Sequence, residues 1–487
     1  MLDDIPRPGI WKRLLVAALL VIFASAGATT VAAFHELDKV VEALELGPEL
    51  KLGARDLAET DPGEPQTLMI LGSDRRPRGN GEGAGTDARS DTIMLVRLDG
   101  DKEATAIMSL PRDLKVEIPG YGTDKINAAY TVGGPALTLK TVKRLTGLQI
   151  NHVINVSFRG FGRAVNAMGC VYADIDRRYY NDSFEFSFID VPPGYQRMCG
   201  KKALQYVRYR HTDTDIVRSA RQQDFLRQTK QQITTGELYE QRDRLLRIFG
   251  RNTTTDAKLR SRSEVLRLLK LALGTADQPI KEIHFEGSLG PSYVEASNSQ
   301  LQKLVQQFLQ VEDTPGPRGR PESSGRRERP RRRKRLKPDA LGLYDASGLG
   351  KDMAVQAVER GAGGKLPVLY PTQLLAGSEF DESPRVYRIK DTEGKKQRAY
   401  RMVVQVTSDL GEYYGLQGTT WQDAPILSGA TETRKIGRRE YELHFAGDRL
   451  RLVAWRTPRA VYWVSNTLLQ SLSEAQMLAI ARAVRRL

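Results

Sequence analysis

The stretch TIMLVRLDGDKEATAIMSL, residues 92–110, decides the fold. Residues 92–98 are almost all apolar, which is typical of a strand covered on both faces of a sheet, and residues 104–110 form a second such run. An Asp-Gly-Asp turn separates the two runs, and a proline ends the second. The pattern predicts a hairpin inside a larger sheet.

Further strand-like and helical runs alternate on both sides of this hairpin. Such alternation predicts helices layered on a mixed central sheet, an α/β (α+β) fold. The strand-like runs are 67–71, 152–156 and 171–175, and the helical runs are 135–145, 158–168, 217–233, 236–248 and 261–273.

The N-terminal segment decides the compartment. Residues 14–34 carry no charge and are long enough to cross a bilayer as a helix of about 20 residues. Basic residues precede them, so by the positive-inside rule residues 1–13 stay in the cytoplasm and the rest lies outside. A cleaved signal peptide is the alternative, because Ala24-Ser25-Ala26 resembles a cleavage site. Either way the body of the protein is exported.

Two cysteines, Cys170 and Cys199, occur in the 487 residues. In an exported protein they predict a disulfide rather than a metal or redox site. On the chain-entropy account that disulfide contributes about 3 kcal/mol to stability. Two buried free thiols are the alternative.

The formal net charge of +15 is concentrated in one segment. Residues 315–337 contain eleven Arg or Lys against two Glu, among many Pro, Gly and Ser. Outside the membrane such a run contacts anionic lipid head groups or acidic wall polymers, or it is simply a solvated, self-repelling linker. Export of the basic residues argues against a DNA-binding regulator.

These observations divide the chain into six parts. The last part has five strand-like runs and a helix capped by Ser473 and Gln476, which predicts a small independent α+β domain of unknown role. The parts are a cytoplasmic N-terminus (1–13), a transmembrane anchor (14–34), a stalk (35–64), a main domain (65–311), a disordered basic linker (312–340) and a C-terminal domain (341–487).

Arg and Asp gather where strands or helices are predicted to end in the main domain. Strand ends are where open sheets bind ligands, and the planar fork of arginine binds phosphate oxygens. Carboxylates beside phosphates suit Mg²⁺, which prefers a few carboxylate oxygens plus substrate phosphates. Taken singly, each of these charges is more often a surface salt bridge. The clusters are residues 71–76, 89–91, 111–113 with Lys125, and 208–223.

The last cluster lies where a helix from about Lys201 is predicted to end in extended chain. We expect Arg208 and Arg210 to lie where that helix gives way to extended chain, and both to point toward the ligand. The next helix places Arg218, Arg221 and Gln222 at i, i+3 and i+4 on one polar face.

Six motifs in this order resemble the LytR-CpsA-Psr (LCP) family over residues 67–232. Members of that family are single-pass proteins facing the wall that move glycopolymers from a polyprenyl diphosphate carrier onto peptidoglycan. The motifs are LGSDRR (71–76), RSDTIML (89–95), SLPRDL (109–114), DKINAAYTVGG (124–134), VINVSFRGF (153–161) and ALQYVRYRHTDTDIVRSARQQ (203–223).

The resemblance implies a Mg²⁺-dependent phosphotransferase and a role for each matching residue. Asp74 and Asp91 would hold Mg²⁺, and four arginines would grip the diphosphate. Asp215, Arg218 and Gln222 would orient the residues that bind the metal ion and the diphosphate. The implied catalytic residues are Arg89, Asp91, Arg112, Arg208, Arg210 and Asp215, and the implied substrate contacts are Arg75, Lys125, Arg218, Arg221 and Gln222.

The expected reaction is attack by an acceptor hydroxyl on the sugar-side phosphorus, with Asp91 or Asp215 as the base. The isoprenoid tail needs an apolar cavity, expected on the sheet face around Met94, Val96 and Met108. A polyprenyl-diphosphate hydrolase and a noncatalytic lipid-diphosphate-binding regulator are the alternatives. Teichoic acid, capsule and arabinogalactan all fit the same phosphate site.

Overall fold

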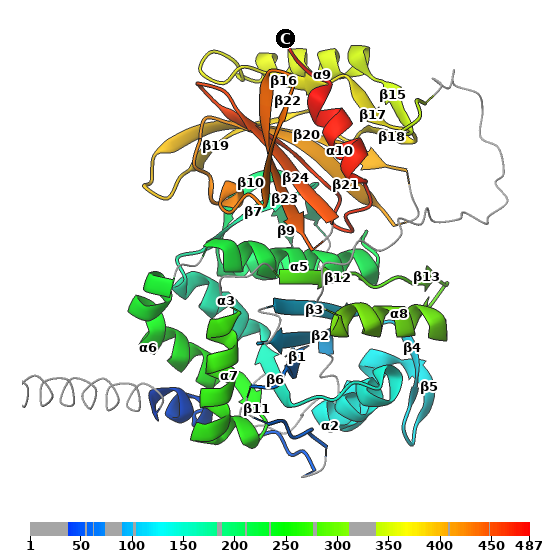
Figure 1. The fold of residues 1–487 in the computed structure, drawn as a ribbon, viewed down its shortest axis with the longest axis vertical. Coiled ribbons are helices and arrows are strands. Elements are labelled where there is room, and N and C mark those ends of the chain that lie inside the picture. The colour runs from blue at the N-terminus through cyan, green and yellow to red at the C-terminus, as the bar shows by residue number, and fades with distance from the viewer. Residues whose placement is uncertain are drawn as a thin grey trace, which may run out of the picture.

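The protein forms two bodies joined end to end, as Figure 1 shows. Among the described residues, no helix is long and apolar enough to cross a membrane. The predicted anchor 14–34 and nearly all of the basic linker lie outside the described residues. The computed structural model describes residues 38–53, 56–61, 63–73, 90–100, 104–182, 188–209, 212–232, 235–275, 280–310, 338–407, 410–447 and 449–487.

A mixed six-stranded sheet in the order β11-β6-β1-β2-β3-β12 forms the centre of the main domain. The β1–β2, β2–β3 and β11–β6 pairs are antiparallel, whereas β6 and β12 run parallel to β1 and β3. The predicted hairpin and mixed sheet are therefore confirmed. The strands are β1 (Gln66–Ser73), β2 (Ser90–Asp99), β3 (Ala104–Leu110), β6 (His152–Ser157), β11 (Thr253–Thr255) and β12 (Ile280–Ile283).

Helices cover both faces of this sheet. α2 and α8 pack on one face, where Ile126 and Phe308 join the main core cluster. α5 and α7 cover the other face, where Leu226 meets Ile107 and Leu271 meets Leu98. The helices are α2 (Ile126–Thr146), α3 (Phe158–Ala167), α4 (Gly200–Arg208), α5 (Asp215–Gln232), α6 (Thr235–Asn252), α7 (Arg262–Gly274) and α8 (Asn298–Leu309).

The apolar residues chosen for the lipid cavity do not share a face of the sheet. In the hairpin, Leu95 lies opposite Met108, whereas Met94 lies opposite Ser109. Opposite residues in an antiparallel pair point to the same side, and successive residues point to opposite sides. Met108 therefore belongs to the α2 and α8 face, and Met94 and Val96 belong to the α5 face. The prediction of one shared face was wrong.

A separate ribbon leads from the main domain toward the second body. β7 (Val171–Ile175) has the predicted bounds, but it pairs with β10 (Gly194–Met198) and not with the central sheet. The predicted Cys170–Cys199 disulfide is present and closes the base of this ribbon. Small pairs β4–β5 (Lys115–Ile118, Gly122–Lys125) and β8–β9 (Tyr179–Asn181, Ile189–Val191) flank the domain.

The C-terminal domain is built on one eight-stranded antiparallel sheet. The predicted strands are all present, and the predicted capping box opens α10 (Glu474–Arg482). α9 (Ser347–Glu359) and β21 were missed. The sheet contains β18 (Ser378–Phe380), β19 (Arg385–Lys390), β20 (Lys396–Val406), β21 (Glu412–Thr419), β22 (Glu432–Ile436), β23 (Arg439–Ala446), β24 (Arg449–Arg456) and β25 (Val461–Ser465).

The two bodies share a core, which the expectation of an independent C-terminal domain did not include. Tyr172 and Tyr195 of the ribbon are buried in one cluster with Trp421 and Trp463 of the C-terminal domain. The Tyr195 hydroxyl accepts a hydrogen bond from the Ile426 backbone N–H at 3.2 Å. Burial of several aromatic rings at one contact contributes strongly to the free energy of folding, so the two bodies stabilise each other.

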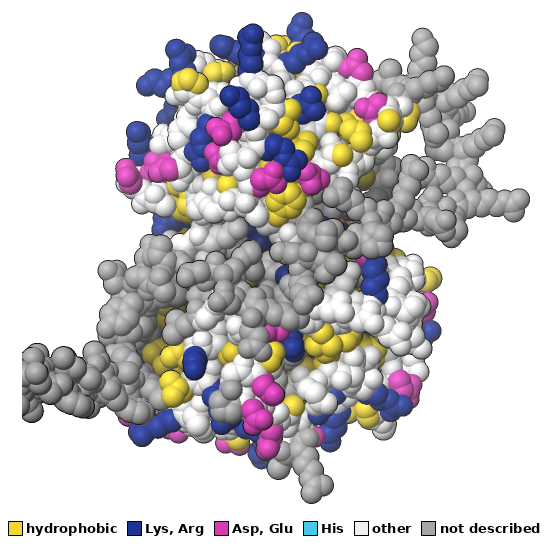
Figure 2. All heavy atoms as spheres, in the orientation of Figure 1, with side chains coloured by type: hydrophobic (Ala, Val, Ile, Leu, Met, Phe, Trp, Pro, Cys, Tyr) yellow, Lys and Arg dark blue, Asp and Glu magenta, His cyan; other side chains and the backbone are white. Residues whose placement is uncertain are grey.

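Charge is mixed over the visible surface of both bodies. In Figure 2, Lys and Arg side chains are interspersed with Asp and Glu, and no single basic field covers this face. The high net charge of the chain is accordingly a property of the linker sequence more than of this face of the folded domains.

Candidate active site at the sheet edge

Strand register brings the predicted motifs to one edge of the central sheet. Asn155, Leu71, Ile93 and Leu110 lie in one row across β6, β1, β2 and β3. β1, β3 and β6 run in the same direction, so all three end at the edge where β2 begins. One predicted arginine or aspartate cluster follows β1, another follows β3 and a third lies at the start of β2, so the strand ends that bear these clusters lie at one edge of the sheet.

Arg112 emerges from this edge two residues after β3 ends. Its Nε lies 3.7 Å from Oδ2 of Asp215, the first residue of α5. The same Asp215 oxygen accepts the backbone N–H of Asp113 at 3.0 Å, and Oδ1 pairs with Arg218 at 2.9 Å. Both oxygens of Asp215 are thus committed to holding Arg112 and Arg218 beside each other.

Lys125 completes this cluster from the end of β5. Its Nζ lies 3.1 Å from Oδ1 of Asp113, and its side chain is about one-third exposed. The backbone carbonyl of Arg112 also accepts the N–H of Asn127 at 3.1 Å, which ties the start of α2 to the cluster. Two cations and the next helix are therefore fixed to the loop that follows β3.

The two carboxylates of the cluster differ in acidity. Burial raises the pKa of Asp215 above its usual value, against the opposing pull of Arg218 and Arg112. Burial also acts to raise the pKa of Asp113, but Arg112 and Lys125 outweigh it and the pKa lies below its usual value. If the pair carries a proton, that proton resides on Asp215.

Arg208 reaches the same edge from the end of α4. Its guanidinium lies 4.0 Å from the centre of the Phe158 ring, and Phe158 directly follows β6. Gly72 of β1 lies beside this ring, and a Cβ there would be tightest against Thr92, at 3.1 Å. α4 ends at Arg208, as predicted, and Tyr209 continues in extended conformation.

Arg221 and Gln222 are placed differently from the predicted substrate contacts. Arg221 is completely buried, pairs with Asp213 and donates to the Tyr209 carbonyl at 2.6 Å. Gln222 donates to the Val207 carbonyl at 3.1 Å. The side chain of Arg221 has no exposed surface, so it cannot bind a substrate directly, whereas Gln222 keeps 8% exposure. The two hydrogen bonds tie α5 to Tyr209 and Val207 at the end of α4.

Asp213 and Arg177 are the residues that the sequence analysis missed. Asp213 bridges Arg221 and Arg177, and Arg177 also donates to the Thr212 hydroxyl at 2.8 Å. Arg177 lies 5.1 Å from the ring centre of Tyr413, a residue of the C-terminal domain. Asp213 stood inside a quoted motif, but nothing in the sequence marked Arg177, which lies between β7 and β8.

Several predicted site residues lie outside what the structure describes. For Asp91 only the backbone is described, as part of β2. Ser73 pairs with Ser90, so the chain positions that lead to Asp74 and Asp91 are neighbours. The residues outside the description are Asp74, Arg75, Arg89 and Arg210.

The part of the chain that the structure describes contains no other candidate metal centre. No three of its His, Cys, Asp or Glu side chains are grouped closely enough to hold a metal ion.

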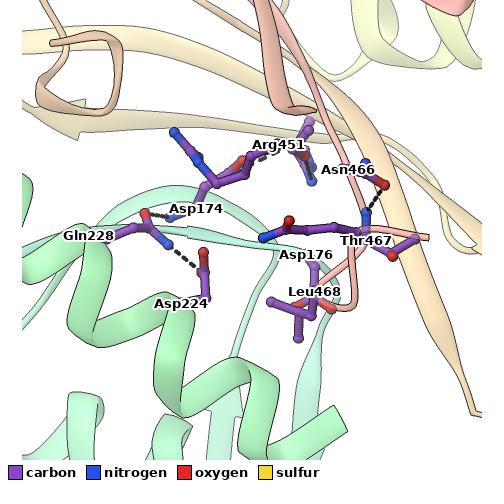
Figure 3. A pocket seen from close by; sticks show the side chains of 11 residues that line it. Asp174, Asp176, Asp224, Gln228, Arg451, Asn466, Thr467 and Leu468 are labelled. Carbon is purple, nitrogen blue, oxygen red and sulfur yellow. Dashed lines mark hydrogen bonds and ion pairs between the residues drawn. The ribbon is translucent and has the colours of Figure 1, made fainter. Parts of the chain in front are cut away.

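A polar pocket lies between the two bodies (Figure 3). Asp174, Asp224 and Gln228 line it from the main domain, and Arg451 and Asn466 line it from the C-terminal domain. The buried guanidinium of Arg401 lies 3.4 Å from Asp174 across the same boundary. Opposite charges meet here, so the pocket is part of the domain contact and not of the phosphate site.

Comparison with known proteins gives one family match. A family model described as the LytR_cpsA_psr family matches residues 29–311. "Probable cell wall biosynthesis protein LcpB" of Corynebacterium glutamicum is 38% identical over 166 residues, which are 32% of this chain and 39% of that protein. "Polyisoprenyl-teichoic acid--peptidoglycan teichoic acid transferase TagT" of Bacillus subtilis is 29% identical over 223 residues, 44% of this chain and 68% of that protein.

A solved structure of Bacillus subtilis TagT aligns with 53% of this chain and 97% of its own. The identity is 23% and the TM-score is 0.40, a likeness too loose to bear on function. The C-terminal domain lies beyond the residues that the family model matches.

Proposed function

Because this chain belongs to the LytR-CpsA-Psr family, we propose that it transfers a glycopolymer from a polyprenyl diphosphate carrier to a peptidoglycan hydroxyl. The products are a phosphodiester between glycopolymer and peptidoglycan and free polyprenyl phosphate. The observation that supports this function is the convergence of Arg112, Arg208 and the paired strand residues Ser73 and Ser90 on one edge of the sheet. The similarity to the teichoic acid transferase TagT of Bacillus subtilis agrees with it.

The reaction is a phosphoryl transfer in which positioning and charge stabilisation supply most of the catalysis. The acceptor hydroxyl oxygen forms a bond to the sugar-side phosphorus, and the bond from that phosphorus to the bridging oxygen breaks. The bridging oxygen leaves with polyprenyl phosphate and takes the electron pair. Arg112 and Arg208 bind the phosphate oxygens on which negative charge grows.

The hydroxyl proton needs an acceptor near the attacking oxygen. Asp215 was one of two candidates, but both of its oxygens are held by Arg112, Arg218 and the Asp113 N–H. Asp91, at the start of β2, is the remaining candidate. We therefore assign Asp91 as the base and Asp215 as the residue that positions Arg112.

Asp74 and Asp91 would hold Mg²⁺ at this edge, because Ser73, the residue before Asp74, pairs with Ser90, the residue before Asp91. Bound there, the ion would neutralise charge on the two phosphates. Lys125 lies at the rim, where its partly exposed ammonium can approach the glycopolymer phosphate.

The location follows from the donor and from the sequence. Residues 14–34 are proposed to anchor the chain in the cell membrane with the N-terminus in the cytoplasm and both folded bodies outside. A lipid-linked donor and a wall acceptor are both available on that side of the membrane. The isoprenoid tail is proposed to lie beside the sheet, within the apolar side chains of one helical layer.

The test uses the purified full chain, a radiolabelled polyprenyl-diphosphate glycan and peptidoglycan fragments. Transfer predicts a labelled glycan phosphate on peptidoglycan and an equal amount of polyprenyl phosphate, both lost when EDTA removes divalent ions. A hydrolase would release the label into water at the same rate without peptidoglycan. A noncatalytic binder would leave the donor intact, and either result would end the proposal.

A further inference from the structure

Four arginines line an open hollow between α3 and α6. Arg163 comes from α3, and Arg244, Arg247 and Arg251 come from α6, with Ile248 and Asn252 between them. The three α6 arginines are spaced by three and four residues, which places them on one face of the helix. We call these four arginines the arginine groove.

The arginine groove carries uncompensated positive charge. All four arginines are exposed to solvent. Among the residues that the structure describes, none of the four forms an ion pair with a carboxylate, although neighbouring surface cations such as Lys39 and Arg262 do. Four clustered guanidinium groups repel one another, so the groove favours an anionic ligand.

The groove lies next to the chain that leads out of the predicted membrane anchor. Helical residues 38–45 pack on the end of α6 so closely that a Cβ on Gly250 would lie 1.6 Å from the Ala43 carbonyl oxygen. Lys39 also pairs with Asp243 of α6 at 3.9 Å. Figure 1 shows this short helix beside α6 and α7.

Chain length limits how far this side of the domain can stand from the bilayer. The predicted anchor ends at Phe34, and an extended chain spans at most about 3.6 Å per residue. Residue 38 therefore lies within about 14 Å of the end of the membrane span. Because residues 38–45 are packed on α6, the arginine groove is held near the membrane surface.

Exposed apolar side chains accompany the arginines on these elements. Phe249 of α6 is 37% exposed, Leu46 is 52% exposed, and Leu266 and Leu269 of α7 are 51% and 42% exposed. Arginines beside exposed aromatic and aliphatic side chains are typical of protein surfaces that rest in the head-group region of a membrane.

We propose that the arginine groove binds the phosphate head groups of anionic phospholipids and so holds the α3–α6 side of the main domain on the bilayer. Guanidinium groups bind phosphate oxygens in paired hydrogen bonds, and each basic residue near an anionic leaflet strengthens binding about fivefold. The proposal depends on the proposed function only for the membrane anchor.

Docking in this orientation has a consequence for the active site. α3 begins at Phe158, whose ring lies under Arg208 at the sheet edge. The helix that contributes Arg163 to the groove therefore starts at the phosphate site. With the groove on the bilayer, a diphosphate carried by a membrane lipid has a short path to Arg208.

The test places the full chain, through its anchor, in nanodiscs of phosphatidylcholine alone or of phosphatidylcholine and phosphatidylglycerol in equal parts. Backbone hydrogen exchange is then measured in α3 and in residues 243–252. The anionic discs should slow exchange there, and added salt should reverse the effect because it screens the charges. Equal exchange in the two kinds of disc would overturn the proposal.

In the variant Arg247→Gln/Arg251→Gln, the slowing of hydrogen exchange by anionic discs should fall about fivefold for each arginine removed. The matched control is Arg438→Gln/Arg459→Gln, which removes two exposed arginines of the C-terminal domain and should keep it. Protection that survives in the groove variant overturns the proposal. A second result would also overturn it. If soluble polyglycerol phosphate slowed exchange in neutral discs while anionic lipid did not, the groove would bind a polymer and not a lipid.

A transfer assay separates this proposal from the proposed function. The groove variant should transfer several-fold more slowly from a donor in anionic discs, yet at the parental rate from a donor dispersed in detergent. If the parent chain transfers nothing in either system, the proposed function fails, while the exchange measurements still decide whether the groove binds lipid.

Discussion

The single carboxylate of Asp215 holds two arginines, and its burial between them shifts its pKa. Its oxygens contact Arg112 and Arg218, and burial raises its pKa despite both cations. An amide at this position keeps the shape but loses the charge that fixes the two guanidinium groups. The placement of Arg112 thus depends on a residue that need not touch the substrate.

Asp215→Asn should lower kcat by about a hundredfold, because a misplacement of about 1 Å at a catalytic group costs that much. KM for the lipid donor should change much less. Steady-state transfer rates over a range of donor concentrations measure both. Asp423→Asn, an exposed carboxylate of the C-terminal domain, is the control. A fall in thermal stability that matches the loss of kcat would instead indicate a purely structural role.

Arg112→Lys tests whether charge alone is sufficient at the sheet edge. A lysine keeps the positive charge but cannot form the paired hydrogen bonds of a guanidinium. Transfer should fall by at least tenfold, and Arg112→Ala should fall further. Radiolabel transfer to peptidoglycan measures both variants, and parental activity in Arg112→Lys would contradict a bidentate phosphate contact.

Two buried histidines at the domain boundary predict acid sensitivity. Burial lowers the pKa of His284 and of His444 to about 3, helped by Arg449 and Arg451 respectively. Their folded pKa lies below the unfolded value of about 6.5. Their contribution to stability is therefore complete above about pH 6.5 and is lost as the pH falls toward 3.

Between pH 6.5 and 5, the free energy of unfolding should fall by roughly 1 to 2 kcal/mol for each histidine, because the unfolded chain takes up the proton. His444→Leu should remove one such contribution, as urea unfolding at several pH values would measure. Burial raises the pKa of Glu282 to about 7 against the pull of Arg227, and this acts in the opposite direction. The difference between variant and parent is thus the informative quantity, and an identical pH dependence would refute the assignment.

Single residues were predictable from sequence where strand ends defined their position. Arg112 follows a strand stopped by proline, and Arg208 ends a helix, so both could be placed at one edge. Arg221 could not be told from a substrate contact, because helical spacing assigns a face and not a depth. Its partner Asp213 and the more distant Arg177 bury it, and that arrangement depends on tertiary contacts.

At the scale of elements, the disulfide fixes the helix that carries Arg208. Cys199 is the residue before α4, and Cys170 follows the turn after α3. A Cβ on Gly200 would lie 2.1 Å from the Gly162 carbonyl, so the two helices touch at this point. The disulfide therefore holds α4 against α3 at the end opposite Arg208.

Cys170→Ser/Cys199→Ser should lower the free energy of unfolding by about 3 kcal/mol, given a loop of 29 residues in sequence separation. Guanidinium denaturation of the variant measures the change. The parent protein reduced with dithiothreitol should unfold at the same denaturant concentration as the variant. Unchanged stability in both would show that packing of α3 on α4 is sufficient.

The predictability of elements followed the clarity of their apolar pattern. The β2–β3 hairpin was found because both strands are apolar runs on either side of an obvious turn. β7 was found with its correct bounds, but its partner was not, since apolar character cannot say which strand lies beside it. α8 was missed although Ser297 and Gln300 form a capping box at its start.

At the scale of the whole molecule, the two bodies are joined by aromatic burial and by buried charge. Tyr195 stacks edge-on against Trp463 at 5.7 Å, and the Trp463 indole N–H donates to Asp174 at 3.2 Å. Arg177 of the phosphate-site scaffold also contacts Tyr413. The C-terminal domain therefore supports the back of the segment that leads from Arg208 to Asp215.

Tyr195→Ala should cost about 3 to 5 kcal/mol, because it leaves a cavity in the shared core. We expect the parent to unfold in one transition and the variant in two, as the bodies separate. Calorimetry measures the number of transitions, and Tyr121→Ala, whose side chain is 56% exposed, is the control. Two transitions already in the parent would show that the shared core does not couple the bodies.

The shared aromatic core also means that one half of it is synthesised well before the other. Tyr195 and its partner Ile426 are 231 residues apart, so the ribbon leaves the ribosome long before its cover is synthesised. At about 5 to 20 residues per second, the wait lasts roughly 10 to 50 seconds. During that interval the nascent chain exposes an apolar surface that has no partner. A chaperone that shields this surface would raise the yield of active protein.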